Sequence, residues 1–201
     1  MIALIDYGAG NLFSVKNALE YLNVDLKVTS DKKDIENADG LILPGVGAFK
    51  QAMENLNDSG LVDTIIESTA KKPLLGICLG MQMLFEESHE FGVSKGLGLL
   101  EGTITKIEAV DLKIPHMGWN SLIKNKECAM TKEIEDNPFV YFVHSYKANA
   151  KPEDVVYYSK YGENIPALVS KGNIFGAQFH PEKSAETGLK MLENFVSLCN
   201  K

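Results

Sequence analysis

The sequence predicts an α/β protein with an open, mostly parallel sheet flanked by helices and carrying an antiparallel extension. In the first half of the chain, short apolar runs alternate with segments of helical periodicity, the pattern of parallel strands joined by crossover helices. The second half holds short strands bounded by glycine, proline and asparagine, as in an antiparallel meander. The length of 201 residues suits a single domain, residues 1–201, with a sizeable core.

The first half is predicted to hold four strands, which are the apolar runs at residues 2–6, 26–29, 40–43 and 72–77. Helices are expected where apolar residues recur at helical spacing, which is the case after Asn11 and over residues 49–56, 61–70 and 81–87. Asn11 stands where an N-cap is needed, because its side chain can accept from a free backbone N–H of the first turn.

The second half begins with a glycine-rich loop over residues 92–98. Alternation of apolar and polar residues then predicts a half-exposed strand at 103–107. The meander is expected from four short strands at 139–143, 155–158, 167–169 and 174–179. A helix over residues 185–199 is predicted to close the chain.

Composition narrows the classes of partner. The net charge of −7 and the pI of about 5.2 give no basic surface for nucleic acid or an anionic membrane. All 20 basic residues are lysine, so an anionic substrate group must be held by lysine, hydroxyls or backbone N–H groups rather than by a guanidinium clamp. No apolar run is long enough to span a bilayer and no signal peptide is recognisable, so we expect a cytoplasmic protein.

The three cysteines are too few and too scattered for a disulfide framework. None of them has metal-ligand spacing, and the four histidines are far apart in sequence, so we predict no metal site and no cofactor. Cys128 and Cys199 are interpreted as structural, and His89 as a surface residue. His116 and His144 are left as structural histidines, with a site-lining role open for His144 because it ends a predicted strand.

Cys78 is the candidate nucleophile. It is the centre of a Gly-Ile-Cys-Leu-Gly segment, residues 76–80, between an apolar strand and a helix. This is the spacing of a nucleophile elbow, whose sharp turn lifts the central side chain above the sheet and whose glycines avoid Cβ clashes. The helix N-terminus favours the thiolate, and the backbone N–H of Leu79 is placed to stabilise an oxyanion. A buried structural cysteine is the weaker interpretation here.

His180 is the candidate base. It follows the last predicted strand in the segment Gln-Phe-His-Pro-Glu, and Glu182 can orient its imidazole. The motif alone fits a solvated turn equally well, but active sites form at the carboxyl ends of strands in open α/β sheets, which favours catalysis. Gly45 and Gly47 flank Val46 just past another strand and would let that peptide turn, so its N–H is a second candidate oxyanion donor, although an ordinary turn also explains the segment.

These motifs and their order resemble the class I, triad-type glutamine amidotransferases. The segments that carry the resemblance are residues 6–12, 43–49, 76–82, 115–120, 141–146 and 178–184. The elbow and the His-Pro-Glu segment are shared by many members of this family. Segments 115–120 (Pro-His-Met-Gly-Trp-Asn) and 141–146 (Tyr-Phe-Val-His-Ser-Tyr) are similar to the glutaminase subunits of imidazole glycerol phosphate synthases.

The resemblance implies a glutaminase. Cys78 would attack the glutamine carboxamide and form a γ-glutamyl thioester, His180 would transfer protons, and Glu182 would hold His180. The N–H groups of Val46 and Leu79 would form the oxyanion hole. The implied substrate-binding residues are Gly45, Gly47, Gln82, Ser145 and Tyr146.

The resemblance also implies a heterodimer with a (β/α)8-barrel cyclase, to which ammonia passes for the synthesis of imidazole glycerol phosphate and aminoimidazole carboxamide ribotide in histidine biosynthesis. Asn11, Trp119, Tyr141 and Lys183 match positions at or near that interface. Core packing for Trp119, a solvated charge for Lys183 and a simple cap for Asn11 remain open.

Three other functions also remain open. A paralogous glutaminase could feed a different synthase, such as a sugar amidotransferase. A non-catalytic scaffold would only bind a partner, and has no need of all three of Cys78, His180 and Glu182. A free-standing cysteine hydrolase would be fully active without a partner.

Overall fold

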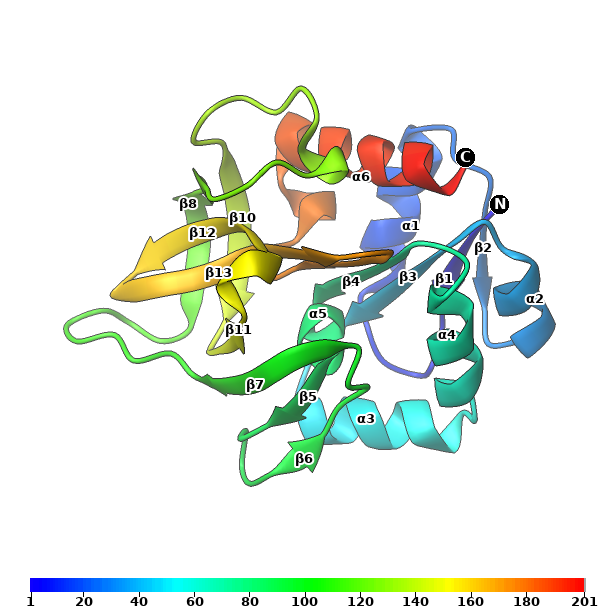
Figure 1. Ribbon diagram of the computed structural model, residues 1–201, viewed down its shortest axis with the longest axis horizontal. Helices are drawn as coiled ribbons and strands as arrows, with labels where there is room; N and C mark the ends of the chain where they lie inside the picture. Colours follow the sequence, from blue (N-terminus) through cyan, green and yellow to red (C-terminus); the bar gives the residue numbers. More distant parts are fainter. Residues whose placement is uncertain (201) are drawn as a thin grey trace.

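The computed structural model describes residues 1–200, so Lys201, the last residue of the predicted domain, lies outside the described residues. Strands and helices alternate along the first half of the chain, and short strands follow in the second half (Figure 1). The predicted fold class, an α/β fold with a mostly parallel main sheet and an antiparallel extension, is confirmed. None of the helices in residues 1–200 has the length and apolar character needed to cross a lipid bilayer.

The main sheet is mostly parallel at one end and antiparallel at the other. In spatial order its strands are β2 (Leu26–Thr29), β1 (Ile2–Ile5), β3 (Gly40–Gly45), β4 (Leu74–Cys78), β14 (Ile174–Ala177), β13 (Glu163–Lys171), β12 (Val155–Tyr161) and β9 (Ile123–Lys124). The pairings from β2 to β14 are parallel and those from β14 to β9 are antiparallel. Because β4 and β14 are parallel neighbours, their carboxyl ends lie side by side.

Helices cover both faces of this sheet (Figure 1). On one face α1 (Leu12–Tyr21) and α6 (Ala185–Cys199) pack on Ile2 and Leu4. On the other face α2 (Lys32–Asn37), α3 (Phe49–Asp58) and α4 (Val62–Thr69) pack with Ala3 and Ile5. Alternate residues of β1 thus belong to separate cores, which is why this strand is apolar throughout. Asn11 caps α1 as predicted, since its side chain accepts from the Ser14 N–H.

Two smaller sheets flank the main one. One holds four strands in the order β11 (Tyr146–Ala150), β7 (Leu100–Lys106), β5 (Phe85–Ser88) and β6 (Ser94–Lys95). The other is the antiparallel pair of β8 (His116–Ser121) and β10 (Phe139–His144). Three short 3-10 helices complete the chain: η1 (Ala129–Thr131), η2 (Pro152–Asp154) and η3 (Pro181–Lys183).

The smaller sheets correct two predictions. The helix expected over residues 81–87 is instead the short α5 (Leu79–Met83) followed by β5, because Phe85 and Ser88 are buried in a sheet built with β7. The strand at residues 139–143 belongs not to the meander but to the pair with β8. Five further elements were not predicted from the sequence, namely α2, β6, β8, β9 and β11.

Glycines let α5 approach the ends of β3 and β4 more closely than any side chain would allow. A Cβ on Gly80 would lie 1.9 Å from the Leu43 carbonyl oxygen, and one on Gly45 would lie 2.6 Å from the Gly80 nitrogen. Both contacts are with backbone, which cannot move aside without shifting a strand. This approach fixes where α5 begins.

We therefore expect Gly80→Ala to lower the free energy of unfolding by about 3 kcal/mol, the upper range for overpacking a core. The matched control is Gly172→Ala, where φ is +58° and nothing lies within 4 Å of the added Cβ. That change carries only the left-handed backbone cost of about 1 kcal/mol. Urea unfolding of both variants tests this, and equal losses would show that the contact with Leu43 is not limiting.

Candidate active site

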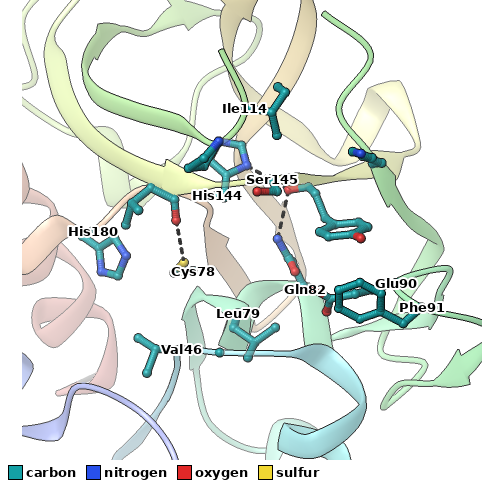
Figure 2. Close-up of a pocket in the computed structure, with 15 residues that line it drawn as sticks. Val46, Cys78, Leu79, Gln82, Glu90, Phe91, Ile114, His144, Ser145 and His180 are labelled. Atoms are coloured by element: carbon teal, nitrogen blue, oxygen red, sulfur yellow. Dashed lines mark hydrogen bonds between the residues drawn. The ribbon is translucent and has the colours of Figure 1, made fainter.

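Cys78 occupies a strained turn between β4 and α5. Its φ is +54° and its ψ is −110°, in a region that residues with a side chain rarely adopt. Such a conformation costs on the order of 1–3 kcal/mol and persists only where the surrounding structure holds it. The side chain is nearly buried, and it faces a cavity above the carboxyl ends of the strands (Figure 2). The sharp turn between strand and helix is therefore present at Cys78, whose role as nucleophile is a proposal taken up below.

The Cys78 sulfur has polar neighbours from two other segments. Sγ lies 3.9 Å from the Val143 carbonyl oxygen, and the Gln178 amide donates to Sγ from 4.0 Å. The ring of His180 stands next to the sulfur (Figure 2). The Val143 carbonyl and the Gln178 amide thus hold the sulfur beside the His180 ring.

His180 and Glu182 form a buried, hydrogen-bonded pair. The distance between His180 Nδ1 and Glu182 Oε1 is 2.8 Å, and the two side chains are 3% and 1% exposed. His180 Nε2 has no hydrogen-bond partner among residues 1–200, so this nitrogen is free to act on Cys78 and a substrate. Burial lowers the pKa of His180, but the neighbouring Cys78 sulfur and the hydrogen-bonded Glu182 carboxylate outweigh it and raise the pKa to about 9.

Backbone contacts with β10 hold the segment that carries His180. The His180 N–H donates to the Tyr141 carbonyl at 2.9 Å. The Ser184 hydroxyl donates to the His180 carbonyl at 2.6 Å and accepts from the Tyr141 N–H at 3.0 Å. Tyr141 therefore holds both ends of this loop.

The cavity beside Cys78 has a volume of about 630 Å³. Its wall includes most of the residues expected to bind substrate or to form the oxyanion hole, namely Val46, Gly47, Leu79, Gln82, Ser145 and Tyr146. Gly45 is not part of the wall and instead packs against α5. Val46 is 43% exposed and is followed by Gly47 at φ +97°, a turn that accepts either orientation of a peptide plane more readily than a residue with a side chain would.

The cavity wall also contains residues that were not predicted for the site, namely Glu90, Phe91, Lys106, Ile114, Pro115 and Val143. Glu90 Oε2 also accepts from the Phe49 N–H at 2.6 Å, at the start of α3. Glu90 follows β5, the strand that was predicted as a helix. Had residues 85–88 been predicted as a strand, the sequence would have placed the Glu90 carboxylate at the end of that strand and near Cys78.

Asn11, Trp119, Tyr141 and Lys183 do not line the cavity. Trp119 is 53% exposed and pairs across β8 and β10 with Tyr141, with ring centroids 6.3 Å apart, so core packing is the wrong interpretation of Trp119. Lys183 is exposed on η3, and both α1 and β10 contact η3. The four residues thus lie on adjoining elements, next to the loop that carries His180.

The remaining titratable candidates fall where they were expected. Cys199 is buried in the core, and burial raises the pKa of its thiol to about 12. Cys128 is half-buried, and His89 is exposed beside Glu87. His116 and His144 are both buried, and only His144 reaches the cavity wall.

Comparisons with known proteins show which family this chain resembles. The family model for glutamine amidotransferase class-I matches residues 3–199. The chain is 55% identical over 197 residues to the imidazole glycerol phosphate synthase subunit HisH of Bacillus thuringiensis subsp. konkukian, covering 97% of this chain and 93% of that protein. The HisH subunit of Bacillus anthracis matches at the same identity and coverage. A crystal structure described as a glutamine amidotransferase has the same fold, with a TM-score of 0.77 at 20% identity over the full length of both chains.

The raised pKa of His180 gives a titration test. We expect the ring of His180 to titrate near pH 9, and Glu182→Gln to lower that midpoint because the carboxylate charge is lost. Because the pKa of His180 is higher in the folded chain than the ordinary value of 6.5, protonated His180 stabilises the folded chain. This contribution is complete below pH 6.5 and is lost as the pH rises through 9. NMR of the histidine ring measures the midpoint, with the exposed Glu186→Gln on α6 as the control. An unchanged midpoint in Glu182→Gln would contradict the assignment.

Proposed function

The chain belongs to the class-I glutamine amidotransferase family, and we propose that it is the glutaminase subunit of an imidazole glycerol phosphate synthase. The observation that carries the proposal is the Cys78, His180 and Glu182 constellation at the cavity, in a chain that is 55% identical to HisH subunits over 97% of its length. Each residue of the constellation has a role in hydrolysing glutamine to glutamate and ammonia.

The reaction begins at Cys78. His180, whose pKa is raised to about 9, accepts the proton that the Cys78 sulfur gives up as it attacks the carboxamide carbon. An S–C bond forms to the carboxamide carbon, the C–N bond breaks, and His180 gives its proton to the departing ammonia. Water then attacks the γ-glutamyl thioester while His180 takes its proton, the S–C bond breaks, and glutamate leaves. Glu182 holds the ring and stabilises its positive charge.

The oxyanion formed in each step needs two donors. The Leu79 N–H lies at the start of α5, where the first backbone N–H groups of the helix have no internal partner. The second donor is the N–H of Val46, on the exposed turn before Gly47. We propose that the Val46 N–H does not point into the site in the isolated chain, and that binding of a partner turns it toward the oxyanion. The free subunit is then a weak glutaminase.

The far wall of the cavity suits the amino-acid end of glutamine. The backbone of Ser145 and Tyr146 offers hydrogen bonds, and the carboxylate of Glu90 can pair with the α-ammonium group. With no arginine in the chain, Lys106 is the basic residue that this wall offers to the α-carboxylate. Gln82 completes the wall beside Tyr146.

The partner that best fits this assignment is a (β/α)8-barrel cyclase. Asn11, Trp119, Tyr141 and Lys183 form the proposed docking face, and an exposed tryptophan paired with a tyrosine is typical of an interface anchor. Ammonia released at Cys78 would pass to the barrel and be used to make imidazole glycerol phosphate and aminoimidazole carboxamide ribotide.

The nucleophile assignment predicts that Cys78→Ala abolishes glutamate release without unfolding the chain. The substitution removes only the sulfur and retains a residue at the strained turn. Turnover is measured as glutamate released from glutamine, and folding by the thermal unfolding midpoint. Cys128→Ala is the matched control, since that cysteine lies outside the cavity wall. Substantial turnover in Cys78→Ala would rule out the mechanism.

The partner assignment predicts a large rise in glutamate release when both the barrel cyclase and its ribulosyl ligand are added to the full-length chain. Trp119→Ala should weaken association by about 2 kcal/mol, as expected for an aromatic anchor, while leaving the basal turnover unchanged. High activity alone, with no response to the cyclase, would instead identify a free-standing hydrolase. A Cys78 that reacts with a glutamine-like alkylator but gives no turnover in either condition would indicate a different synthase.

A further inference from the structure

Two buried histidines beside the cavity have no part in the mechanism above. His116 Nδ1 lies 3.0 Å from His144 Nε2, so the two rings share one hydrogen bond. His144 Nδ1 lies 2.8 Å from the Tyr146 carbonyl oxygen, and His116 Nε2 lies 3.1 Å from the Asn120 side-chain nitrogen. These contacts form a continuous relay from β8 to the cavity wall.

The two ends of the relay, the Asn120 amide and the Tyr146 carbonyl, determine which atom donates in each of its hydrogen bonds. The Asn120 amide nitrogen donates to the Lys160 carbonyl and the Asn120 oxygen accepts from the Ser121 N–H, so the orientation of the Asn120 amide is fixed. His116 Nε2 must then accept from Asn120, which leaves the proton on His116 Nδ1. By the same reasoning His144 accepts at Nε2 and donates from Nδ1. The Tyr146 carbonyl, which can only accept, closes the relay consistently.

The relay ends on the Tyr146 carbonyl oxygen, which also holds the side chain of Gln82. The Tyr146 carbonyl accepts a second hydrogen bond from the Gln82 amide at 3.1 Å. The same Gln82 nitrogen donates to Gln178 Oε1 at 3.0 Å, and Gln178 in turn donates to the Cys78 sulfur. Because both Gln82 protons are used, its oxygen is the free acceptor that this side chain offers the substrate (Figure 2).

Burial keeps both rings neutral, which the relay requires. It lowers the pKa of His144 to about 3 and that of His116 to about 4. His116 is also held between aromatic rings, stacked on Phe142 at 4.5 Å and on Tyr161 at 4.1 Å between centroids. The relay therefore has one protonation state and a restricted geometry at neutral pH.

We propose that His144 is a positioning residue for glutamine binding: its Nδ1–H, in a tautomer set by His116 and Asn120, holds the Tyr146 carbonyl and through it the orientation of Gln82. This inference rests on the proposed glutaminase function, because it assigns a role to a residue of the same site. The relay starts on β8, whose Met117 and Trp119 are exposed while His116 is buried. The strand at the proposed docking face is thereby tied to the substrate-binding backbone.

The tautomer is tested directly on the unmodified full-length chain. Long-range ¹H–¹⁵N NMR of the histidine rings distinguishes Nδ1–H from Nε2–H. We expect both His116 and His144 to be neutral with the proton on Nδ1 at pH 7.5. An Nε2–H tautomer or an imidazolium at His144 would overturn the proposal.

Kinetics test the consequence, in the complex with the cyclase. His144→Phe keeps a ring but loses the donor to Tyr146, and we expect the KM for glutamine to rise about 10-fold with kcat retained within about threefold. In His144→Asn the amide nitrogen replaces Nδ1, so KM should recover to within about threefold of the wild-type value. His89→Phe, at an exposed histidine, is the control. An unchanged KM in His144→Phe, or loss of kcat alone in both His144 variants, would overturn the proposal in favour of a merely structural role.

Failure of this inference is distinguishable from failure of the proposed function. If wild-type chain with cyclase releases no glutamate, the function is wrong, whereas the NMR result still decides the tautomer. If wild-type turnover is normal and the His144 variants behave like the control, only the positioning role is wrong.

Discussion

The close backbone contact between α5 and the end of β3 is the constraint on which the rest of the site depends. Gly80 meets the Leu43 carbonyl where no side chain has room, and this contact fixes the first turn of the helix. Cys78 must then complete the turn in a conformation that costs free energy. The glycine contact leaves the turn at Cys78 little room to relax, and the packing of the two cores supplies the stability that offsets the strain.

The order of strands in the main sheet brings the other residues of the proposed catalytic group to Cys78. β14 pairs in parallel with β4, so the chain leaving β14 passes directly over the elbow and delivers Gln178 and His180. A separation of about 100 residues in sequence becomes one strand spacing in space. The antiparallel strands then add a wall to the cavity, with Ser145 between β10 and β11 and Tyr146 at the start of β11. One parallel pairing thus brings Cys78 and His180 together, and the smaller sheets supply the wall that we propose binds the substrate.

The sequence was most informative where chemistry is encoded locally. The elbow at Cys78, the His180–Glu182 pair, the cap at Asn11 and the terminal helix follow from short-range patterns, and the structure contains all of them. Contacts set by distant pairing could not be predicted in this way. Residues 81–87 have helical spacing, but residues 85–88 form a strand because β7 pairs with them. Glu90 follows this strand and reaches the cavity as a result. The protonation of His144 depends on Asn120, a relation visible only once β8 and β10 are paired.

Tyr141 connects the loop that carries His180 with the surface of the protein beside Trp119. Its backbone N–H and carbonyl hold the loop of His180, while its side chain meets Trp119 at the surface. The two roles are carried by different atoms of the residue. A new side chain at position 141 changes the surface beside Trp119, whereas any residue except proline keeps both backbone hydrogen bonds to the His180 loop. The surface at this position can therefore change while the loop beneath it stays in place.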